Sequence, residues 1–331
     1  MKNIIIFGGA GFIGTNLTKY LLDKGNKILC VDNFFTGKLN NINQFLKNQN
    51  YLYMNADITD GQTFVDLEDI IESYFYNFID EIYNLACPAS PPKYQIDPIY
   101  TIHTSIAVEN VCKLAIKYDS KMLHTSTSEV YGDPDNKHHP QKESYRGNVN
   151  TMGPRACYDE GKRIAETIIY EYIKLGCRAK IIRIFNTYGP YMDPNDGRVI
   201  SNFICQALNN LPFTIYGSGN QSRSFQYITD LINGMELVMK TDDDINGPIN
   251  IGSPYEFTMN ELIDMIRELI PESKSKIIYK ELPQDDPTQR QADITYINKL
   301  TNYKPKVELK EGLINTINYF KNHYKEYENV L

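Results

Sequence analysis

The sequence lacks the residues and patterns of several common classes of protein. Its six cysteines show no C-x-x-C spacing and it has only five histidines, so it carries no zinc-binding signature. No apolar run is long enough to cross a membrane. The apolar run near the amino terminus is interrupted by glycines and is not followed by a small-residue cleavage site, which makes it a poor signal peptide. These absences predict a cytoplasmic protein with free thiols and no metal.

Positive charge is also in short supply. The formal net charge is -7, with 42% hydrophobic and 23% charged residues. Proteins that bind nucleic acid usually concentrate basic residues on one face, so this balance favours a small-molecule partner over nucleic acid or a membrane. At 331 residues the chain is long enough for two domains, or for one domain with a large appendage.

Apolar runs alternate with amphipathic stretches in the first half of the chain. Buried strands are predicted over residues 3–8, 27–32, 81–86, 121–126 and 179–185. Helical spacing occupies residues 12–25, 98–118 and 163–176. This alternation predicts an α/β fold with a doubly wound parallel sheet of the Rossmann type.

After residue 185, turns rich in proline and glycine separate shorter elements, with helices near 231–240 and 258–270. We therefore expect a larger domain over residues 1–185, with a return segment at about 226–253. Residues 186–225 and 254–331 would form a smaller, carboxy-terminal substrate-binding domain.

A glycine-rich turn follows the first predicted strand. Gly8, Gly11 and Gly14 precede a helix, where glycines permit a tight turn and let the backbone approach a pyrophosphate at the helix amino terminus. Asp32 ends the second strand, where its carboxylate can accept the ribose hydroxyls of a dinucleotide. An acid there repels a 2'-phosphate and so favours NAD over NADP, although Lys38 nearby weakens this distinction. The alternative is a plain glycine turn beside a surface acid.

Tyr158 lies one helical turn before Lys162. A phenol with a pKa near 10 must be shifted by roughly three units, or about 4 kcal/mol, to act as a base near neutral pH. An ammonium about 4 Å away supplies roughly that energy at an effective dielectric constant near 20. Alone, the spacing also fits an ordinary helix surface. After a dinucleotide motif and the hydroxyl of Thr127 at a strand end, it predicts a catalytic base.

Several segments carry a family resemblance, among them "TSTSEVYGDP", "CYDEGKRIAE", "RIFNTYGP" and "QDDPTQRQADI". They resemble the extended short-chain dehydrogenase/reductase family of nucleotide-sugar enzymes, and within it the branch that decarboxylates UDP-glucuronate. The motifs run in order and cover nearly the whole chain. The resemblance implies an NAD-binding first domain and a nucleotide-sugar-binding second domain. It also implies a homodimer formed by helices that contain residues 101–118 and 158–173.

The chemistry of that reaction suits the residues present. Oxidation of the C4 hydroxyl of glucuronate places the C5 carboxylate β to a ketone. Loss of CO2 then leaves an enolate held on the C4 oxygen, so neither a metal nor pyridoxal is required. Return of the hydride to C4 gives UDP-xylose and regenerates NAD.

The resemblance assigns roles residue by residue. Tyr158 takes the C4 hydroxyl proton, Lys162 lowers the pKa of Tyr158 and can hold the nicotinamide ribose, and Thr127 orients the alcohol. The implied cofactor contacts are Gly8, Gly11, Phe12, Ile13, Gly14, Asp32, Asn33, Asp57, Ile58, Leu85, Ala86, Tyr158 and Lys162. The implied substrate contacts are Tyr94, Asn186, Arg198, Tyr216, Arg223 and Arg290.

Three further positions separate this reaction from its siblings. A related 4,6-dehydratase has an Asp where this chain has Ser128, and serine is a poor acid for expelling water. A related 4-epimerase usually lacks an acid at the position of Glu129. Glu129 either orients the sugar or a water or donates a proton, and either Glu129 or Arg290 delivers the proton to C5. Arg290 is expected near the sugar carboxylate, or else in a surface salt bridge with Asp285, Asp286 or Asp293. Dehydratase, epimerase and a non-catalytic NAD-binding protein remain the alternatives.

The chain departs from the family pattern at three loop positions. Tyr191 replaces a usual Arg, Arg146 a usual Trp and Thr151 a usual Pro. These changes bear on loop geometry and substrate affinity, and they leave the reacting residues intact.

Overall fold

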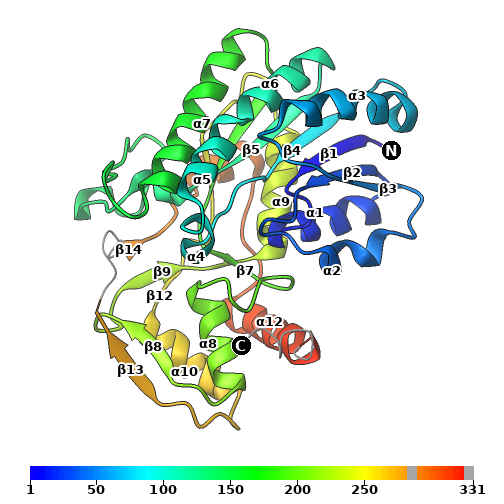
Figure 1. Ribbon diagram of the computed structural model, residues 1–331. Coiled ribbons are helices and arrows are strands. Elements are labelled where there is room, and N and C mark those ends of the chain that lie inside the picture. The colour runs from blue at the N-terminus through cyan, green and yellow to red at the C-terminus, as the bar shows by residue number, and fades with distance from the viewer. Residues whose placement is uncertain (282–288, 324–331) are drawn as a thin grey trace.

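The computed structural model describes residues 1–281 and 289–323 (Figure 1). Its centre is a seven-stranded sheet with the strand order β11-β6-β5-β4-β1-β2-β3, in which every neighbouring pair is parallel. The strands are β1 (Asn3–Phe7), β2 (Lys27–Asp32), β3 (Tyr51–Asn55), β4 (Glu81–Asn84), β5 (Lys121–Thr127), β6 (Ala179–Ile184) and β11 (Ile249–Ile251). The predicted doubly wound α/β fold is confirmed.

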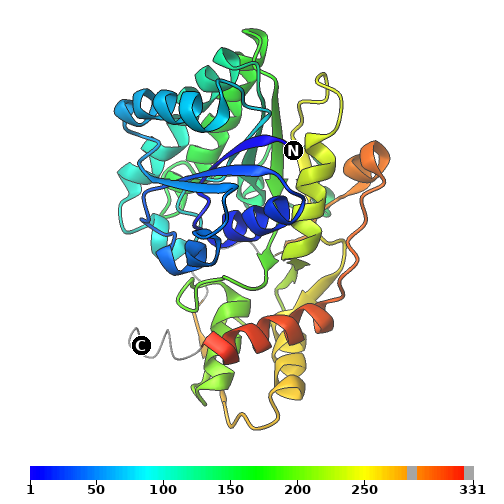
Figure 2. The same cartoon turned by 90° about the vertical axis from the view of Figure 1, so that its right-hand side faces the viewer.

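Both faces of the sheet are buried, which explains the continuous apolar runs. In β1, Ile4 and Ile6 enter one hydrophobic cluster, whereas Ile5 and Phe7 enter the other. Helices from the two halves of the chain cover these faces (Figures 1 and 2). One face carries α3 (Gly61–Phe75), α5 (Pro98–Ile106), α6 (Val108–Lys117) and α7 (Ala156–Lys174), and the other carries α1 (Phe12–Asp23) and α9 (Ile228–Met239).

The helix predicted over 98–118 is divided in the structure into α5 and α6. The hydroxyls of Thr104 and Ser105 hydrogen-bond to the carbonyl of Thr101, at 2.8 and 3.2 Å. Such side-chain bonds to the preceding turn compete with regular helical geometry. The chain leaves the helix at Ala107, and α6 starts at the next residue.

Two strands of the sheet, β3 and β11, lie outside the five predicted ones. β3 is an edge strand, and Leu52 and Tyr53 are more than one third exposed, so its sequence has no buried run. β11 has only three residues, although all three are buried. Neither segment therefore carries the long apolar signal by which the other strands are recognised.

The smaller part of the molecule lies at one end of the sheet (Figure 1). Residues 228–251 return to the large sheet, where α9 covers a face and β11 extends the edge. The helix α11 (Thr295–Thr301) also packs against α9 and β11. The remaining elements of the second half of the chain are the helices α8 (Val199–Leu208), α10 (Met259–Leu269) and α12 (Leu309–His323) and the strands β7 (Thr187–Tyr188), β8 (Phe213–Tyr216), β9 (Ser222–Ser224), β10 (Gln226–Tyr227), β12 (Glu256–Thr258), β13 (Ile277–Lys280) and β14 (Gln289–Arg290). The helices predicted near 231–240 and 258–270 correspond to α9 and α10. None of the described helices is long and apolar enough to cross a bilayer.

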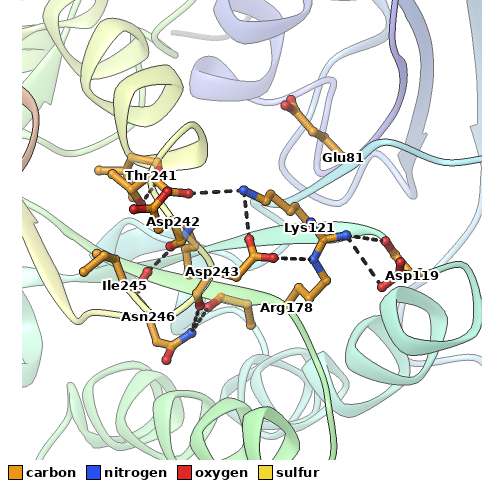
Figure 3. Close-up of polar contacts among 12 residues, drawn as sticks. Glu81, Asp119, Lys121, Arg178, Thr241, Asp242, Asp243, Ile245 and Asn246 are labelled. Carbon is orange, nitrogen blue, oxygen red and sulfur yellow. Dashed lines mark hydrogen bonds and ion pairs between the residues drawn. The ribbon is translucent and has the colours of Figure 1, made fainter.

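Charged side chains fix the loop between α9 and β11 at the end of the sheet where β5 and β6 begin (Figure 3). Lys121 forms a 2.8 Å ion pair with Asp243 and donates to the carbonyl of Thr241 at 3.1 Å. Arg178 binds the other oxygen of Asp243 at 2.8 Å. This network anchors the loop far from the carboxyl ends of the strands, where ligands bind in open parallel sheets.

Candidate active site

The carboxyl ends of the strands open into a cavity of about 800 Å³. It lies at the point where the strand order reverses between β1 and β4, and the smaller part of the chain closes it from the other side. All residues predicted for the site line this cavity except Asp57. The carboxylate of Asp57 instead accepts hydrogen bonds from Asn33 and Tyr100, each at 2.8 Å, and so holds the loop that follows β2.

The glycine turn has no room for side chains at Gly8 and Gly14. A Cβ on Gly14 would lie 2.2 Å from the carbonyl oxygen of Gly8, and a Cβ on Gly8 would lie 2.8 Å from the amide of Ala86. In the described structure, α1 has Gly11 as its N-cap, no side-chain cap and no acidic residue in its first turn. Its amide groups are therefore available to an anion such as a pyrophosphate.

Asp32 is held at the edge of the same cavity. One carboxylate oxygen accepts from the amide of Ala10 at 2.9 Å and the other from the amide of Phe34 at 2.8 Å. Burial raises the pKa of Asp32, while these two hydrogen bonds lower it in part. Each oxygen keeps a lone pair for a ribose hydroxyl. The turn and this carboxylate together fit an adenine dinucleotide.

Tyr158 and Lys162 lie on the first turns of α7 and are both buried. The ring of Tyr158 stacks on Tyr94, with centroids 5.0 Å apart and an interplanar angle of 3°. Lys162 Nζ donates to the carbonyl of Thr125 at 2.8 Å and lies 5.9 Å from the centroid of the Tyr158 ring. The backbone of β5 thus fixes the ammonium beside the phenol.

In the chain by itself, the pKa of Tyr158 is not lowered. Burial has the largest effect and raises it, whereas a hydrogen bond with Thr127 and the charge of Arg198 act in the opposite direction. We expected Lys162 to lower the pKa of Tyr158, and this effect stays a prediction for the protein with its ligands bound. Thr127 also accepts from the amide of Glu129 at 3.2 Å, which starts the short helix η2 (Ser128–Tyr131) at the end of β5.

Glu129 lies between two guanidinium groups. Arg290, from β14, binds it through both terminal nitrogens, one of them at 2.8 Å, and Arg155, the N-cap of α7, binds it from another side. Burial by itself would raise the pKa of Glu129, but the charges of Arg290 and Arg155 lower it to about 2. Glu129 is therefore ionised near neutral pH, which suits orienting a ligand and not donating a proton.

The sequence predictions did not include Arg155. A signal was present, because Arg155 and Asp159 have the i,i+4 spacing of an ion pair on one helix face. The side chain of Arg290 is buried and pairs with Glu129. Of its predicted surface partners, Asp285 and Asp286 lie outside the described residues.

Three of the predicted substrate contacts, Arg198, Tyr216 and Arg223, come from the smaller part of the chain and line the cavity. Arg198 pairs with Asp196 at 3.2 Å and donates to the carbonyl of Ala89 at 3.1 Å. Arg223 is buried on β9, and Tyr216 is exposed at the end of β8. Two arginines at one end of the cavity suit a diphosphate.

Two of the departures from the family pattern have visible contacts. Tyr191 lines the cavity, adopts a left-handed backbone conformation with φ 68°, and donates to Gln44 at 3.0 Å. The carbonyl of Arg146 accepts from Arg163 on α7 at 2.7 Å.

Comparison with known proteins identifies relatives over nearly the full chain. A sequence model of the NAD dependent epimerase/dehydratase family matches residues 4–252. UDP-glucuronic acid decarboxylase 1 of Danio rerio is 45% identical over 96% of this chain and 72% of its own length. UDP-glucuronic acid decarboxylase 5 of Arabidopsis thaliana is 46% identical over 94% of this chain and 86% of its own length.

A solved structure is also similar. It is UDP-glucuronic acid 4-epimerase from Bacillus cereus in complex with UDP-glucuronic acid and NAD. That structure covers 97% of this chain and 100% of its own, with 27% identity and a TM-score of 0.80.

The geometry at Asp32 predicts the choice of cofactor. NAD should bind at least about tenfold more tightly than NADP, because a carboxylate close to a 2'-phosphate repels it. Asp32→Asn should narrow this ratio by weakening NAD binding and improving NADP binding. Calorimetry with NAD and with NADP measures the ratio of the two affinities. Asp60→Asn, at the N-cap of α3 and outside the cavity, is the matched control. Equal affinities in the unmodified protein would contradict the role given to Asp32.

Proposed function

This chain belongs to the NAD-dependent epimerase/dehydratase family, and we propose that within it the chain converts UDP-glucuronate to UDP-xylose and CO2. Relatives named UDP-glucuronic acid decarboxylase, 43–46% identical over at least 94% of the chain, support the reaction. The cofactor is NAD, in keeping with the family and with the fit of the glycine turn and Asp32.

One observation in the cavity carries the proposal. The buried pair of Glu129 and Arg290 lies beside the Tyr158 phenol and Thr127, and all of these residues line one cavity. A guanidinium at this place suits a substrate that bears a carboxylate next to the reacting carbon. Ser128 stands where a 4,6-dehydratase needs an acid to protonate the departing C6 hydroxyl, and serine cannot supply that proton.

The side chains divide the reaction between them. Tyr158 accepts the proton of the C4 hydroxyl, and Thr127, which hydrogen-bonds the same phenol, orients that hydroxyl. Bound NAD supplies the acceptor and later the donor of the C4 hydride, and its nicotinamide ring carries a positive charge. Lys162, fixed by the backbone of β5, keeps an ammonium next to the phenol throughout.

Decarboxylation follows from the ketone at C4. The C5–carboxylate bond breaks, its electron pair forms the enolate, and the charge develops on the C4 oxygen near Tyr158 and Thr127. The Arg290 charge stabilises the carboxylate and the growing negative charge. Glu129 is ionised, so we assign it to orienting the sugar or a water that delivers the C5 proton. Protonation of C5 and return of the hydride to C4 complete the formation of UDP-xylose.

The phenol gives the first test of this mechanism. Tyr158→Phe should lower the rate of UDP-glucuronate turnover by about 10²–10⁴-fold, because proton transfer is lost while the stacked ring is kept. NAD affinity should change little. Tyr172 lies farther along α7 and donates its hydroxyl to Glu109 on α6, so Tyr172→Phe is the matched control and should retain its rate. A Tyr158→Phe protein with nearly normal turnover would show that another group is the base.

The reaction itself is tested by incubation with UDP-glucuronate and NAD, with products followed by mass spectrometry and NADH by absorbance. The unmodified protein should release CO2 and UDP-xylose without net NADH. Arg290→Gln should slow decarboxylation more than C4 oxidation and so accumulate NADH or a 4-keto sugar. Arg178→Gln, at the far end of the sheet, should behave normally. Formation of UDP-galacturonate without CO2 would establish the epimerase instead, and a 4-keto-6-deoxy product from UDP-glucose would establish the dehydratase.

We also propose that the chain forms a homodimer through α5 and α7. These helices lie side by side on one face of the sheet (Figure 1) and leave Ile99, Ile106 and Ile164 more than 40% exposed. Apolar side chains at these positions suit a partner helix pair in a four-helix arrangement. Light scattering should give twice the mass of 38.1 kDa, and Ile164→Asp should give the monomer. A monomeric unmodified protein at working concentration would refute the proposal.

We further propose that the chain works in the cytoplasm. Its six cysteines all lie in the described part of the chain and form no disulfide there, which is typical of proteins in reducing compartments.

A further inference from the structure

A segment of the smaller part of the chain is fastened to the dinucleotide-binding part. This segment, residues 190–198, connects β7 to α8, and we call it the strap. Met192 is buried in the hydrophobic cluster that includes Phe203 of α8, and the ring of Tyr191 packs against Tyr319 of α12 with centroids 5.2 Å apart. The strap therefore belongs to the smaller part by its packing. Apart from Arg198, the reaction above gives it no role.

Asp193 joins the strap to two loops of the larger part. Its Oδ1 forms an ion pair with Lys38 Nζ at 3.2 Å, and its Oδ2 forms one with Lys93 Nζ at 3.7 Å. Lys38 is in the loop after β2, and Lys93 is in α4 (Pro91–Tyr94), which follows β4. The exposed fraction of the Asp193 side chain is 17%, so salt screens these pairs less than it screens pairs on the open surface.

Hydrogen bonds to the backbone fasten both ends of the strap. At its start, Asn16 of α1 donates to the carbonyl of Pro190 at 3.0 Å. At its end, Arg198 donates to the carbonyl of Ala89 at 3.1 Å. The two ion pairs of Asp193 lie between these anchors in the sequence, so they control whether the middle of the strap stays closed.

The strap crosses the place where a dinucleotide binds. In the sheet, β1 lies between β2 and β4, so the glycine turn after β1 lies between the two loops that Asp193 joins. Asp193, Lys38 and Lys93 line the same cavity as Gly11 and Asp32. In open parallel sheets the pyrophosphate sits at the turn after the first strand, in the crevice at the switch point. The pairs of Asp193 therefore bridge that crevice from one side to the other.

We propose that Asp193 is a positioning residue that holds the strap closed over the pyrophosphate of NAD, so that the cofactor stays on the protein between the two hydride transfers. Retention matters because the hydride that leaves C4 must return from the same nicotinamide. Cofactor retention does not depend on the sugar, and only its consequence for the product rests on the proposed function.

A closed strap affects the two rate constants of NAD binding in the same direction. Its contacts join residues of the protein to one another, so they are broken for NAD to enter as well as for NAD to leave. Loss of the Asp193 charge therefore raises the association and the release rate constants together, and the Kd, which is their ratio, changes little. A residue that only touched bound NAD would change the release rate constant and the Kd by the same factor.

The experiment measures these rates on the full chain without any sugar. Protein loaded with radiolabelled NAD is chased with excess unlabelled NAD to give the release rate, and calorimetry gives the Kd. Asp193→Asn removes the charge but keeps an oxygen that can accept from the amide of Asn195, as Asp193 does at 3.0 Å. Release and association should each become about tenfold faster, the size expected when two partly buried ion pairs are lost, while the Kd changes less than about threefold.

Salt and two further variants separate the ion pairs from other effects. Raising the salt concentration from about 0.05 to about 0.5 M should speed release from the unmodified protein more than from Asp193→Asn, because salt screens the pairs. Lys93→Gln should speed release by a smaller factor, since the pair with Lys38 remains. Asp23→Asn, which breaks an exposed 3.0 Å pair with Lys19 on α1, is the matched control and should keep the rates of the unmodified protein.

Unchanged rates in Asp193→Asn, or faster release with unchanged association, would overturn the role of Asp193. If that variant fails to bind NAD, the salt test decides, and release from the unmodified protein that does not respond to salt would overturn the role. None of these results bears on the proposed reaction.

The consequence for the product is tested with UDP-glucuronate. When NADH escapes after C4 oxidation and loss of CO2, C5 takes a proton from solvent and a 4-keto pentose remains on UDP. Asp193→Asn should therefore release NADH and this 4-keto sugar in equal amounts, and complete conversion to UDP-xylose without free NADH would overturn this consequence. An unmodified protein that retains NAD but forms no CO2 would contradict the proposed function and leave the role of Asp193 standing.

Discussion

A carboxylate cannot be buried in a protein at low cost unless a cation or a proton accompanies it, and the active site is arranged around this constraint at Glu129. The two arginines that satisfy Glu129 come from distant parts of the chain, Arg155 from the start of α7 and Arg290 from β14. The pairing therefore links the large sheet to the smaller part of the molecule. It also places Arg290 at the cavity, where the proposed function needs a cation for the substrate carboxylate.

The same logic extends to the reacting phenol. Tyr158 is buried against Tyr94, and burial raises its pKa, so the chain alone keeps the phenol protonated. The ammonium of Lys162 is held by a hydrogen bond to a carbonyl of β5. Both side chains are thus held in place on α7, and the positive charge of a bound nicotinamide ring is expected to favour the ionised phenol, as proton transfer requires.

Features with a local sequence signal could be predicted. The glycine turn, five of the seven sheet strands and the pairing of Tyr158 with Lys162 each depend on residues close together in the chain. The edge strand β3 and the short β11 were missed because they carry no long apolar run. Arg155 was missed because its main partner is Glu129, which only the fold brings close. The direction of the pKa shift at Glu129 depends on two arginine charges that outweigh the effect of burial, and no spacing in the sequence reveals this arrangement.

The central claim is that CO2 leaves from a 4-keto sugar through an enolate. The measurement that tests it most directly is conversion of UDP-glucuronate in deuterated water, with the product analysed by NMR. The account predicts UDP-xylose with a single deuterium on C5, because the enolate carbon takes its proton from solvent, and no deuterium on C4, because the hydride returns there. UDP-xylose formed without deuterium on C5 would contradict the account.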